Sequence, residues 1–232
     1  MNNTSASLKK ILILVTILAV PGFLYYLLQE KGKNRYRPLA KFGPKEIAST
    51  FHKVRGKQIP DTIYHTISDF KLTNQDDQPI SFDARNKQIT VVNFFFTRCT
   101  AFCPAMNKEM QRVVQQYEKN KLLRFLSITV DPGYDTPAIL KQYVQKYNQK
   151  SGKWDFLTGP APLISKLAKQ DFLVDVVKDT TRVNNYIHSS MLILTDPQKR
   201  IRGYYDSTNK EEVDKLIDEI KVLITEELRN KK

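Results

Sequence analysis

The sequence predicts an α/β fold built on a mixed β-sheet. Strand-like apolar runs alternate with helix-like segments over residues 89–168, which is typical of parallel strands connected by helices. Two hairpin-like segments, at 68–82 and 191–205, flank this alternation and add antiparallel strands. An amphipathic segment after residue 208 is expected to form the last helix. With 232 residues, the chain has room for one such domain plus appendages.

The chain is basic, with a net charge of +13. Its Lys and Arg residues are spread over the whole length, whereas a nucleic-acid-binding protein usually gathers them in a stripe interleaved with aromatic residues. The charge therefore fits an ordinary basic surface, with attraction to anionic membrane lipids as the alternative.

Residues 11–28 contain no charged residue. These 18 residues would rise about 27 Å as a helix, just enough to cross the hydrocarbon layer of a membrane. Tyr25 and Tyr26 lie near the far end, where aromatic belts form. No small-residue cleavage site follows the run cleanly. We therefore expect an uncleaved transmembrane signal anchor at 11–28, after a cytoplasmic N-terminus at 1–10.

The segment at 29–63 is expected to be a linker, because it is polar and basic and contains Pro38, Pro44 and Pro60. The excess of Lys and Arg just after the apolar run would by itself place the C-terminal side in the cytoplasm. The globular domain is expected to span residues 64–232.

The hairpin at 68–82 is indicated by alternating apolar and polar residues on both sides of a polar turn. Residues 89–96 are the clearest strand, because they are largely apolar at consecutive positions, as in a central strand covered on both faces. A helix is expected after Pro104, with one apolar stripe made of Met106, Met110, Val113, Val114 and Tyr117.

Later elements follow from the same patterns. Residues 123–130 predict a second buried strand, and Pro137 occupies a favoured first position of a helix. Shorter segments predict a strand at 154–157, a helix at 163–168, and strands at 191–194 and 202–205. Thr208-x-x-Glu211 is a capping box that should start the last helix. This order predicts a thioredoxin-like fold with an N-terminal β-hairpin extension, preceded by one transmembrane helix.

Cys99 and Cys103 are the only cysteines in the chain, and they fall between the central strand and the following helix. Reactive cysteines occupy this position in thioredoxin-like folds. A disulfide across so short a loop would add little stability, so the pair is expected to be reactive rather than structural. The extra residue relative to Cys-x-x-Cys lets both sulfurs point to a common centre, and thiolates select Cu(I), Zn or Fe–S clusters.

A metal held by two thiolates needs a further ligand, and the chain has three histidines. His52 falls in the expected linker and His65 at the edge of the first strand, where solvated and structural roles are expected. His188 lies in a polar loop before a strand, so it is a candidate ligand, with a capping or turn role as the alternative. Three methionines could supply a thioether sulfur, but their positions fit the core: Met106, Met110 and Met191.

Several motifs occur in the order found in one known family. They are Phe95-Phe-Thr-Arg-Cys-Thr-Ala-Phe-Cys-Pro104, Val130-Asp-Pro-x-x-Asp-Thr-Pro137, His188-Ser-Ser, and Asp196-Pro with Ile201-Arg-Gly-Tyr-Tyr205. From residue 64 to the C-terminus the chain resembles the Sco/SenC family, membrane-anchored thioredoxin-like copper proteins that help assemble the Cu(A) centre of cytochrome c oxidase. The resemblance implies copper, as Cu(I) or Cu(II), bound by Cys99, Cys103 and His188.

The resemblance also implies a setting and partners. The partners would be the cytochrome c oxidase subunit that carries Cu(A) and other copper donors, with no nucleic acid. The protein would be a single-pass protein of the bacterial inner (cytoplasmic) membrane with its C-terminal domain facing the periplasm, which overrides the charge count above. A cysteine pair that can form a disulfide suits that oxidising compartment.

The match to the family has departures at the cysteine loop. Members usually have proline directly after the first cysteine and often an acidic residue next, where this chain has Thr100 and Ala101. We expect these residues to alter the metal affinity or redox potential rather than the ligand set. Asp131 is expected either to cap a turn or to lie near the site.

Two other function classes stay open. A thiol–disulfide oxidoreductase would cycle Cys99 and Cys103 between dithiol and disulfide without obligatory metal, with His188 tuning the thiolate. A peroxiredoxin-like peroxidase also places a cysteine after a strand, but Thr97 lies only two positions before Cys99, and a second cysteine so close is unusual for that class.

Overall fold

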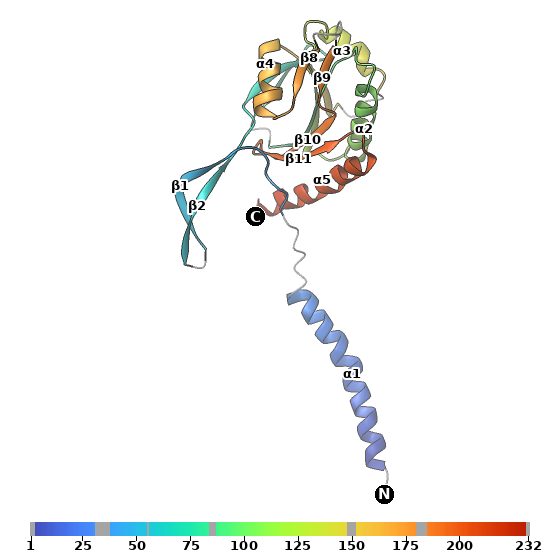
Figure 1. Ribbon diagram of the computed structural model, residues 1–232. Helices are drawn as coiled ribbons and strands as arrows, with labels where there is room; N and C mark the ends of the chain where they lie inside the picture. Colours follow the sequence, from blue (N-terminus) through green and yellow to red (C-terminus); the bar gives the residue numbers. More distant parts are fainter. Residues whose placement is uncertain are drawn as a thin grey trace. The chain divides into compact units, whose positions relative to one another are not determined.

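The computed structural model describes residues 3–30, 38–54, 56–83, 87–147, 152–179 and 185–230 (Figure 1). Side chains are described throughout these ranges except at residues 3–8, 11, 28–30, 176–179, 185–188 and 230. The chain divides into two units, Met1–Arg37 and Pro38–Lys232, which are treated separately below.

The first unit holds a single described helix, α1 (Asn3–Glu30). The prediction of a transmembrane helix at 11–28 is not supported: in the part of the chain that the structure describes, no helix is long and apolar enough to cross a membrane.

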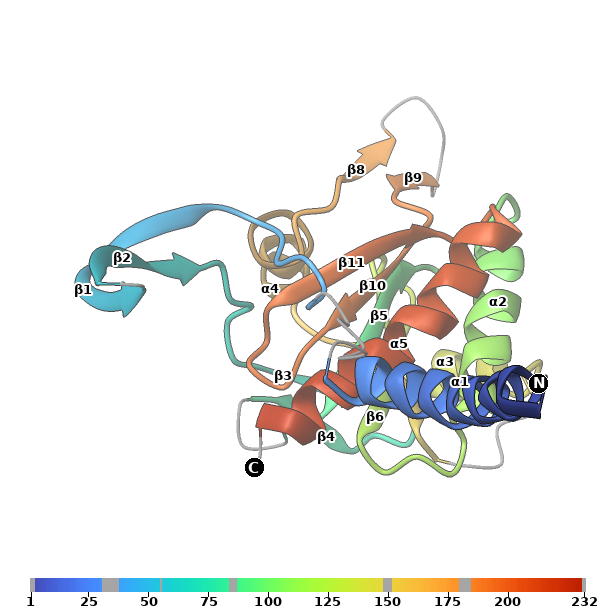
Figure 2. The same ribbon diagram turned by 90° about the horizontal axis from the view of Figure 1, so that it is seen from below.

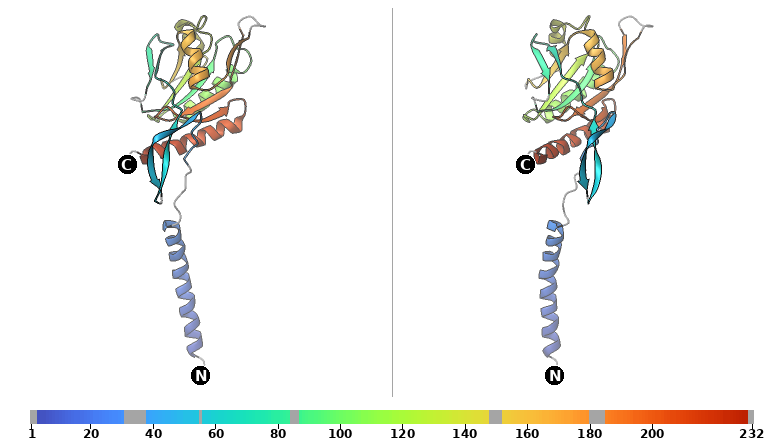
Figure 3. Two further views of the ribbon diagram at one scale, coloured as in Figure 1. Left: turned by 60° about the vertical axis from the view of Figure 1, so that its left-hand side comes forward. Right: turned by 90° about the vertical axis from the view of Figure 1, so that its left-hand side faces the viewer.

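The segment expected to be a linker contains two strands, β1 (Lys45–Val54) and β2 (Lys57–Tyr64), which pair with each other as an antiparallel hairpin. Figure 3 shows this ribbon apart from the main sheet. Gly56 lies in the turn with φ +81°, a left-handed conformation that glycine adopts without strain. Most side chains of the hairpin are exposed. Neither strand has a buried face, so neither was indicated by alternating apolar and polar residues.

Residues before the hairpin are also attached to the domain. The fully buried guanidinium of Arg202 donates to the carbonyl oxygens of Leu39 (2.7 Å) and Ala40 (3.1 Å). The same guanidinium is paired with the carboxylates of Asp196 and Glu226. The second unit, Pro38–Lys232, therefore includes residues that come before the expected boundary at residue 64.

The main sheet has seven strands in the order β11-β10-β5-β6-β7-β3-β4. The central strands β5 (Ile89–Phe95), β6 (Leu123–Thr129) and β7 (Trp154–Thr158) are parallel to one another. The outer strands are antiparallel: β10 (Met191–Thr195) and β11 (Ile201–Asp206) on one side, β3 (Phe70–Asn74) and β4 (Pro79–Phe82) on the other. The predicted α/β class with a mixed sheet is confirmed.

Helices cover both faces of the sheet, which explains why β5 is buried at every position. On one face, Phe95 packs against Tyr143 of α3 (Pro137–Val144). On the other, Phe94 packs against Phe172, which follows α4 (Ala161–Lys166) and the π-helical turn η2 (Leu167–Asp171). The helices α2 (Cys103–Gln116) and α5 (Lys210–Asn230) lie side by side (Figure 2), joined by an ion pair between Arg112 and Asp214.

A buried polar network fixes α2 against the sheet. The Trp154 indole N–H donates to Ser127 Oγ (2.8 Å), and the Ser127 hydroxyl donates to Asn93 Oδ1 (2.5 Å). The Asn93 amide donates to Asn107 Oδ1 (2.9 Å), and the Asn107 amide donates to the Tyr143 hydroxyl (3.1 Å). Because Asn107 lies one helical turn after the start of α2, this network holds the N-terminal end of the helix in a defined position.

The last helix starts differently from the prediction. Asn209, not Thr208, caps α5, because its Oδ1 accepts the Glu211 N–H at 2.9 Å. The Thr208 hydroxyl instead donates to Asp206 at 2.8 Å, so the predicted capping box is wrong. A further two-stranded sheet, β8 (Val176–Asp179) with β9 (Asn185–His188), was not predicted.

Candidate metal centre

The two cysteines lie where the central strand leads into α2. β5 ends at Phe95, a loop covers residues 96–102, and Cys103 is the first residue of α2. The Cys99 N–H donates to the Phe96 carbonyl at 3.2 Å, which folds the loop back toward the strand. Cys99 and Cys103 are thiols in this structure, and their side chains are hydrogen-bonded to each other. The two cysteines therefore lie at the strand-to-helix corner where the sequence places them.

The two thiols differ in their surroundings. Cys103 is fully buried, and Cys99 is half-buried at the domain surface. Burial, assisted by the hydrogen bond with Cys99, raises the pKa of the Cys103 thiol far above its usual value. Thr100 and Ala101, the departures from the family pattern, are exposed at the tip of the loop. A molecule approaching from solvent therefore meets the loop tip and Cys99 before Cys103.

Asp135 holds the start of the cysteine loop. Its carboxylate accepts the Thr97 N–H (3.1 Å), the Thr97 hydroxyl (2.5 Å) and the Thr129 hydroxyl. The carboxyl group is completely buried, and this burial raises its pKa, while the hydrogen bonds from the two threonines act in the opposite direction. The loop that follows β6 thus fixes the residue two positions before Cys99.

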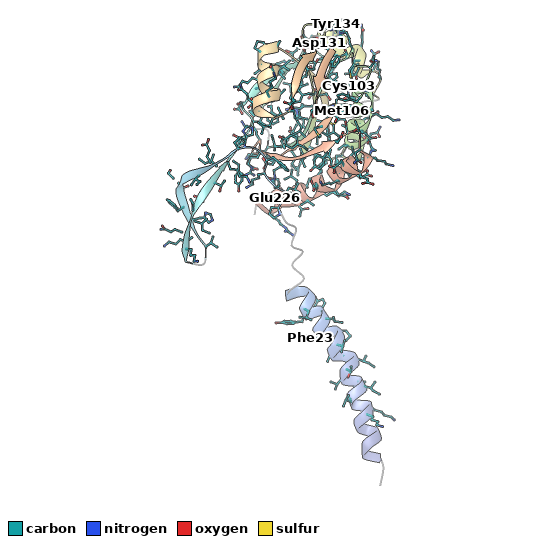
Figure 4. The ribbon with its side chains drawn as sticks, in the orientation of Figure 1. Phe23, Cys103, Met106, Asp131, Tyr134 and Glu226 are labelled. Carbon is teal, nitrogen blue, oxygen red and sulfur yellow. The ribbon has the colours of Figure 1, made fainter. Side chains whose placement is uncertain are left out.

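Arg98 supplies a second tie between the same loops. Its guanidinium forms an ion pair with the buried carboxylate of Asp131 and lies over the ring of Tyr134, 4.1 Å from the ring centroid. Figure 4 shows Asp131 and Tyr134 at the same end of the domain as Cys103. Asp131 therefore lies near the cysteine loop, and its carbonyl also accepts the N–H groups of Tyr134 and Asp135 in a turn. Of the two expectations for Asp131, these contacts bear out its position beside the cysteine loop.

The backbone brings the candidate histidine toward the same sheet edge. β10 is antiparallel to β5, with Ile193 opposite Val92 and Thr195 opposite Thr90, so β10 begins toward the end of β5 that leads into the cysteine loop. His188 ends β9, three residues earlier, and its backbone is paired with Val176. The His188 side chain lies outside the described residues. Among the side chains that are described, no cluster of three His, Cys, Asp or Glu residues could hold a metal ion.

The other two histidines are bound by other residues, and the three methionines pack in or against the core. His52 is on the exposed hairpin, where its Nδ1 is 2.6 Å from Asp61 Oδ1. His65 is half-buried, with Nε2 2.7 Å from the Asp171 carbonyl oxygen, in agreement with a structural role. Met106 and Met110 are fully buried in the core, as expected, and Met191 is partly buried against it.

The sequence did not reveal the roles of Arg98, Tyr134 and Asp135, which hold the cysteine loop in place. The sequence feature that could have indicated Asp135 was the Asp-Pro-x-x-Asp-Thr-Pro motif at 131–137. This motif follows β6, which is parallel to β5. Parallel strands end at the same edge of a sheet, so the motif had to lie beside the cysteines.

Comparison with known proteins agrees with this arrangement. The SCO1/SenC family model matches residues 60–225. The chain belongs to the SCO1/SenC family. The matched region includes both cysteines, the motif at 131–137 and His188.

Three proteins that are similar to this chain have descriptions that bear on its function. A putative copper-binding protein of Stutzerimonas stutzeri is 33% identical over 141 residues, which cover 60% of this chain and 68% of the relative. The crystal structure of a SCO1/SenC family lipoprotein from Bacillus anthracis is 28% identical with a TM-score of 0.63, covering 69% of this chain and 95% of that one. BsSco, described as a cytochrome c oxidase assembly protein with a disulfide switch, is 28% identical with a TM-score of 0.61, covering 69% and 94%.

Proposed function

We propose that this protein is a copper-binding metallochaperone that delivers copper to, or prepares the cysteines of, the Cu(A) site of a cytochrome c oxidase. The observation that carries the proposal is the pair of thiols, Cys99 in the loop after β5 and Cys103 at the first residue of α2. β10, which pairs with β5, follows the segment that contains His188. One similar protein is named a putative copper-binding protein, and another is described as a cytochrome c oxidase assembly protein, which supports the proposal. The scaffold is proposed to be thioredoxin-like.

In this proposal, copper is the cargo, and the ligands are the sulfurs of Cys99 and Cys103 with an imidazole nitrogen of His188. Two thiolates suit Cu(I), and imidazole suits copper in either common oxidation state. The ties through Asp135 and Arg98 keep the cysteine loop in place, so little ordering is needed when the metal binds. The exposed Thr100 and Ala101 adjust the affinity without supplying a ligand.

Copper titration of the full chain, purified reduced in detergent, tests the ligand set. We expect about one copper per wild-type chain, loss of binding in Cys99→Ser and Cys103→Ser, and an affinity at least about tenfold lower in His188→Ala. His52→Ala is the matched control, because His52 lies on the exposed hairpin, and it should bind as the wild type does. Equal Cu(II) affinity and unchanged visible absorption in His188→Ala would remove the histidine from the site.

A second candidate function is favoured by the unequal exposure of the two thiols. A thiol–disulfide oxidoreductase needs an accessible sulfur that attacks and a sheltered one that resolves, which matches Cys99 and Cys103. The Cys99 thiolate would attack a partner disulfide and release one partner thiolate. Cys103 would then lose its proton and attack Cys99 Sγ, which releases the second partner thiolate and leaves a Cys99–Cys103 disulfide.

A comparison of Cys99→Ser with His188→Ala distinguishes the two candidate functions. If thiol exchange dominates, Cys99→Ser abolishes reduction of a Cu(A)-type partner disulfide while His188→Ala retains it. If metal transfer dominates, His188→Ala fails to load the partner with copper even when the partner cysteines are supplied reduced.

The proposal includes attachment to a membrane, with the domain in an oxidising compartment such as the periplasm. The described side chains at 12–26 are uncharged and exposed on all sides of α1, and such a helix needs apolar surroundings. A related protein is described as a lipoprotein. Extraction of native membranes with alkaline carbonate tests this point: the full chain should stay in the pellet, and its release into the supernatant would contradict attachment through α1.

A further inference from the structure

The hairpin of β1 and β2 has two faces of different charge. Cross-strand partners in an antiparallel pair point to the same side, and sides alternate along each strand. The register therefore places on one side, called here the basic face, the residues Lys45, Ile47, Phe51, Lys53, Gln58, Pro60, Thr62 and Tyr64. The opposite side, called the mixed face, carries Glu46, His52, Val54, Lys57, Ile59, Asp61 and Ile63.

Two contacts agree with this division. The Lys45 ammonium lies over the ring of Tyr64, 5.8 Å from its centroid, on the basic face. On the mixed face, His52 and Asp61 are hydrogen-bonded at 2.6 Å. Both carboxylates of the two strands, Glu46 and Asp61, thus belong to the mixed face, and the charges of the basic face are all positive.

The basic face also exposes large apolar side chains. Ile47 is 81% exposed and Phe51 is 61% exposed, and Lys45 and Lys53 flank them along β1. In the described structure, β1 and β2 pair only with each other, so Ile47 and Phe51 are not part of the core of the main sheet. Bulky apolar residues bordered by lysines, with no carboxylate among them, have the composition of surfaces that bind anionic membranes.

We propose that the basic face of this hairpin rests on an anionic lipid bilayer, with Ile47 and Phe51 in the interfacial layer and Lys45 and Lys53 beside lipid phosphates. Lysine suits this role because its ammonium is a compact charge on a flexible stem that needs no fixed partner geometry. Charge complementarity favours lipid, whose surface carries many diffuse negative charges, over a protein partner.

The position of the hairpin in the chain agrees with a lipid partner. Residues 31–44, a stretch of 14, separate α1 from β1, and a chain of that length spans at most about 50 Å. The hairpin therefore stays within reach of the membrane to which α1 is proposed to attach. Copper binding plays no part in this inference, so the copper titration and the lipid experiment can fail independently.

A tryptophan placed on the basic face tests the proposal in the full chain. The only native tryptophan, Trp154, is buried, so its emission gives a constant background that the wild type measures. Phe51→Trp is mixed with vesicles of zwitterionic lipid alone, or with about one-third anionic lipid, each with and without brominated acyl chains. We expect a shift to shorter wavelength and strong bromine quenching only with anionic vesicles.

Ile63→Trp is the matched control, because Ile63 is also exposed and lies on the mixed face. It should be quenched much less than Phe51→Trp in the same vesicles. Adding Lys45→Glu and Lys53→Glu to Phe51→Trp should raise the anionic lipid needed for half-maximal quenching at least about tenfold. Co-flotation with zwitterionic vesicles reports attachment through α1 separately.

The proposal is overturned if Phe51→Trp and Ile63→Trp are quenched equally, if anionic vesicles leave the Phe51→Trp emission unchanged, or if the lysine reversals have no effect. An emission shift that requires an acidic protein and does not occur with vesicles also overturns it and assigns the basic face to a protein partner. Far-ultraviolet circular dichroism confirms that each variant is folded, as expected for exposed positions.

Discussion

Asp135 binds Thr97 twice, through the backbone N–H at 3.1 Å and the side-chain hydroxyl at 2.5 Å. The two residues are 38 positions apart and lie in different loops. Their contact means that the cysteine loop is positioned by the loop after β6 as well as by the strand and helix that flank it.

Asp135→Ala should loosen the cysteine loop and destabilise the domain. The substitution leaves the Thr97 N–H and the Thr129 hydroxyl without their acceptor in a buried site, and we expect a loss of about 2–4 kcal/mol in the free energy of unfolding. Urea unfolding measures the loss. Asp135→Asn keeps the size and one acceptor oxygen, so it should lose less. A free energy for Asp135→Ala within about 0.5 kcal/mol of wild type would show that these bonds do not hold the loop.

Arg98→Ala should weaken the second tie between the loops. It removes the cation opposite the buried carboxylate of Asp131 and uncovers the Tyr134 ring, so we expect a loss of about 1–3 kcal/mol. Arg98→Lys restores the charge but not the planar stacking, and its stability should be intermediate. Thermal unfolding of the three proteins in one buffer checks this order, and an Arg98→Lys variant less stable than Arg98→Ala would contradict it.

Asn107→Leu should be costly although the two side chains are similar in size. It leaves the Asn93 amide without its acceptor inside the core and removes one of the two hydrogen-bond partners of the Tyr143 hydroxyl, so we expect a loss of about 2–4 kcal/mol. Met110→Leu is the control on the same helix, because Met110 is also fully buried but apolar, and it should cost less than about 1.5 kcal/mol. Chemical denaturation that gives equal costs would mean that the polar network does not stabilise the fold.

Tyr117→Phe should change how stability depends on alkaline pH. Burial raises the pKa of Tyr117 to about 12, with the nearby Asp218 carboxylate acting in the same direction, and the hydroxyl donates to the Ile217 carbonyl at 2.5 Å. An unfolded tyrosine titrates near pH 10. Because the folded pKa is the higher one, the unfolded chain loses its proton first, and stability falls as the pH rises from about 10 to about 12.

The Tyr117→Phe variant should therefore be less stable than wild type near neutral pH, because the hydrogen bond to Ile217 is lost. It should lose less free energy than wild type as the pH rises through that window. Urea unfolding at about pH 8, 10.5 and 11.5 gives the comparison. Parallel curves for the two proteins would show that Tyr117 keeps an ordinary pKa in the fold.

The elements that the sequence predicted correctly have an apolar pattern that matches their burial, either one apolar face or a continuous apolar run. The helix after Pro104 is predicted by the spacing of Met106, Met110 and Val113, and all three are fully buried. The strand at 89–96 is predicted by its nearly continuous apolar run, and helices cover it on both faces.

The β1–β2 hairpin, which the sequence did not predict, lacks such a face. The hairpin at 45–64 is exposed along both strands, so hydrophobic periodicity carries no information about it. Asn93 lies inside an apolar strand, and its role depends on Asn107 and Ser127, which reach it only in the folded sheet. Asp135 is similar, because a lone carboxylate in a turn motif does not reveal which distant donor it will accept from.

The β1–β2 ribbon also bears on how the protein avoids self-association. An exposed strand edge offers backbone donors and acceptors in a row, and such edges can recruit strands from other molecules. Here the register shift between Ile47 and Phe51 interrupts that row on β1, and Pro60 removes one donor from β2. The ribbon cannot extend easily into an intermolecular sheet, so the protein can expose Ile47 and Phe51 without providing a nucleus for fibrous aggregation.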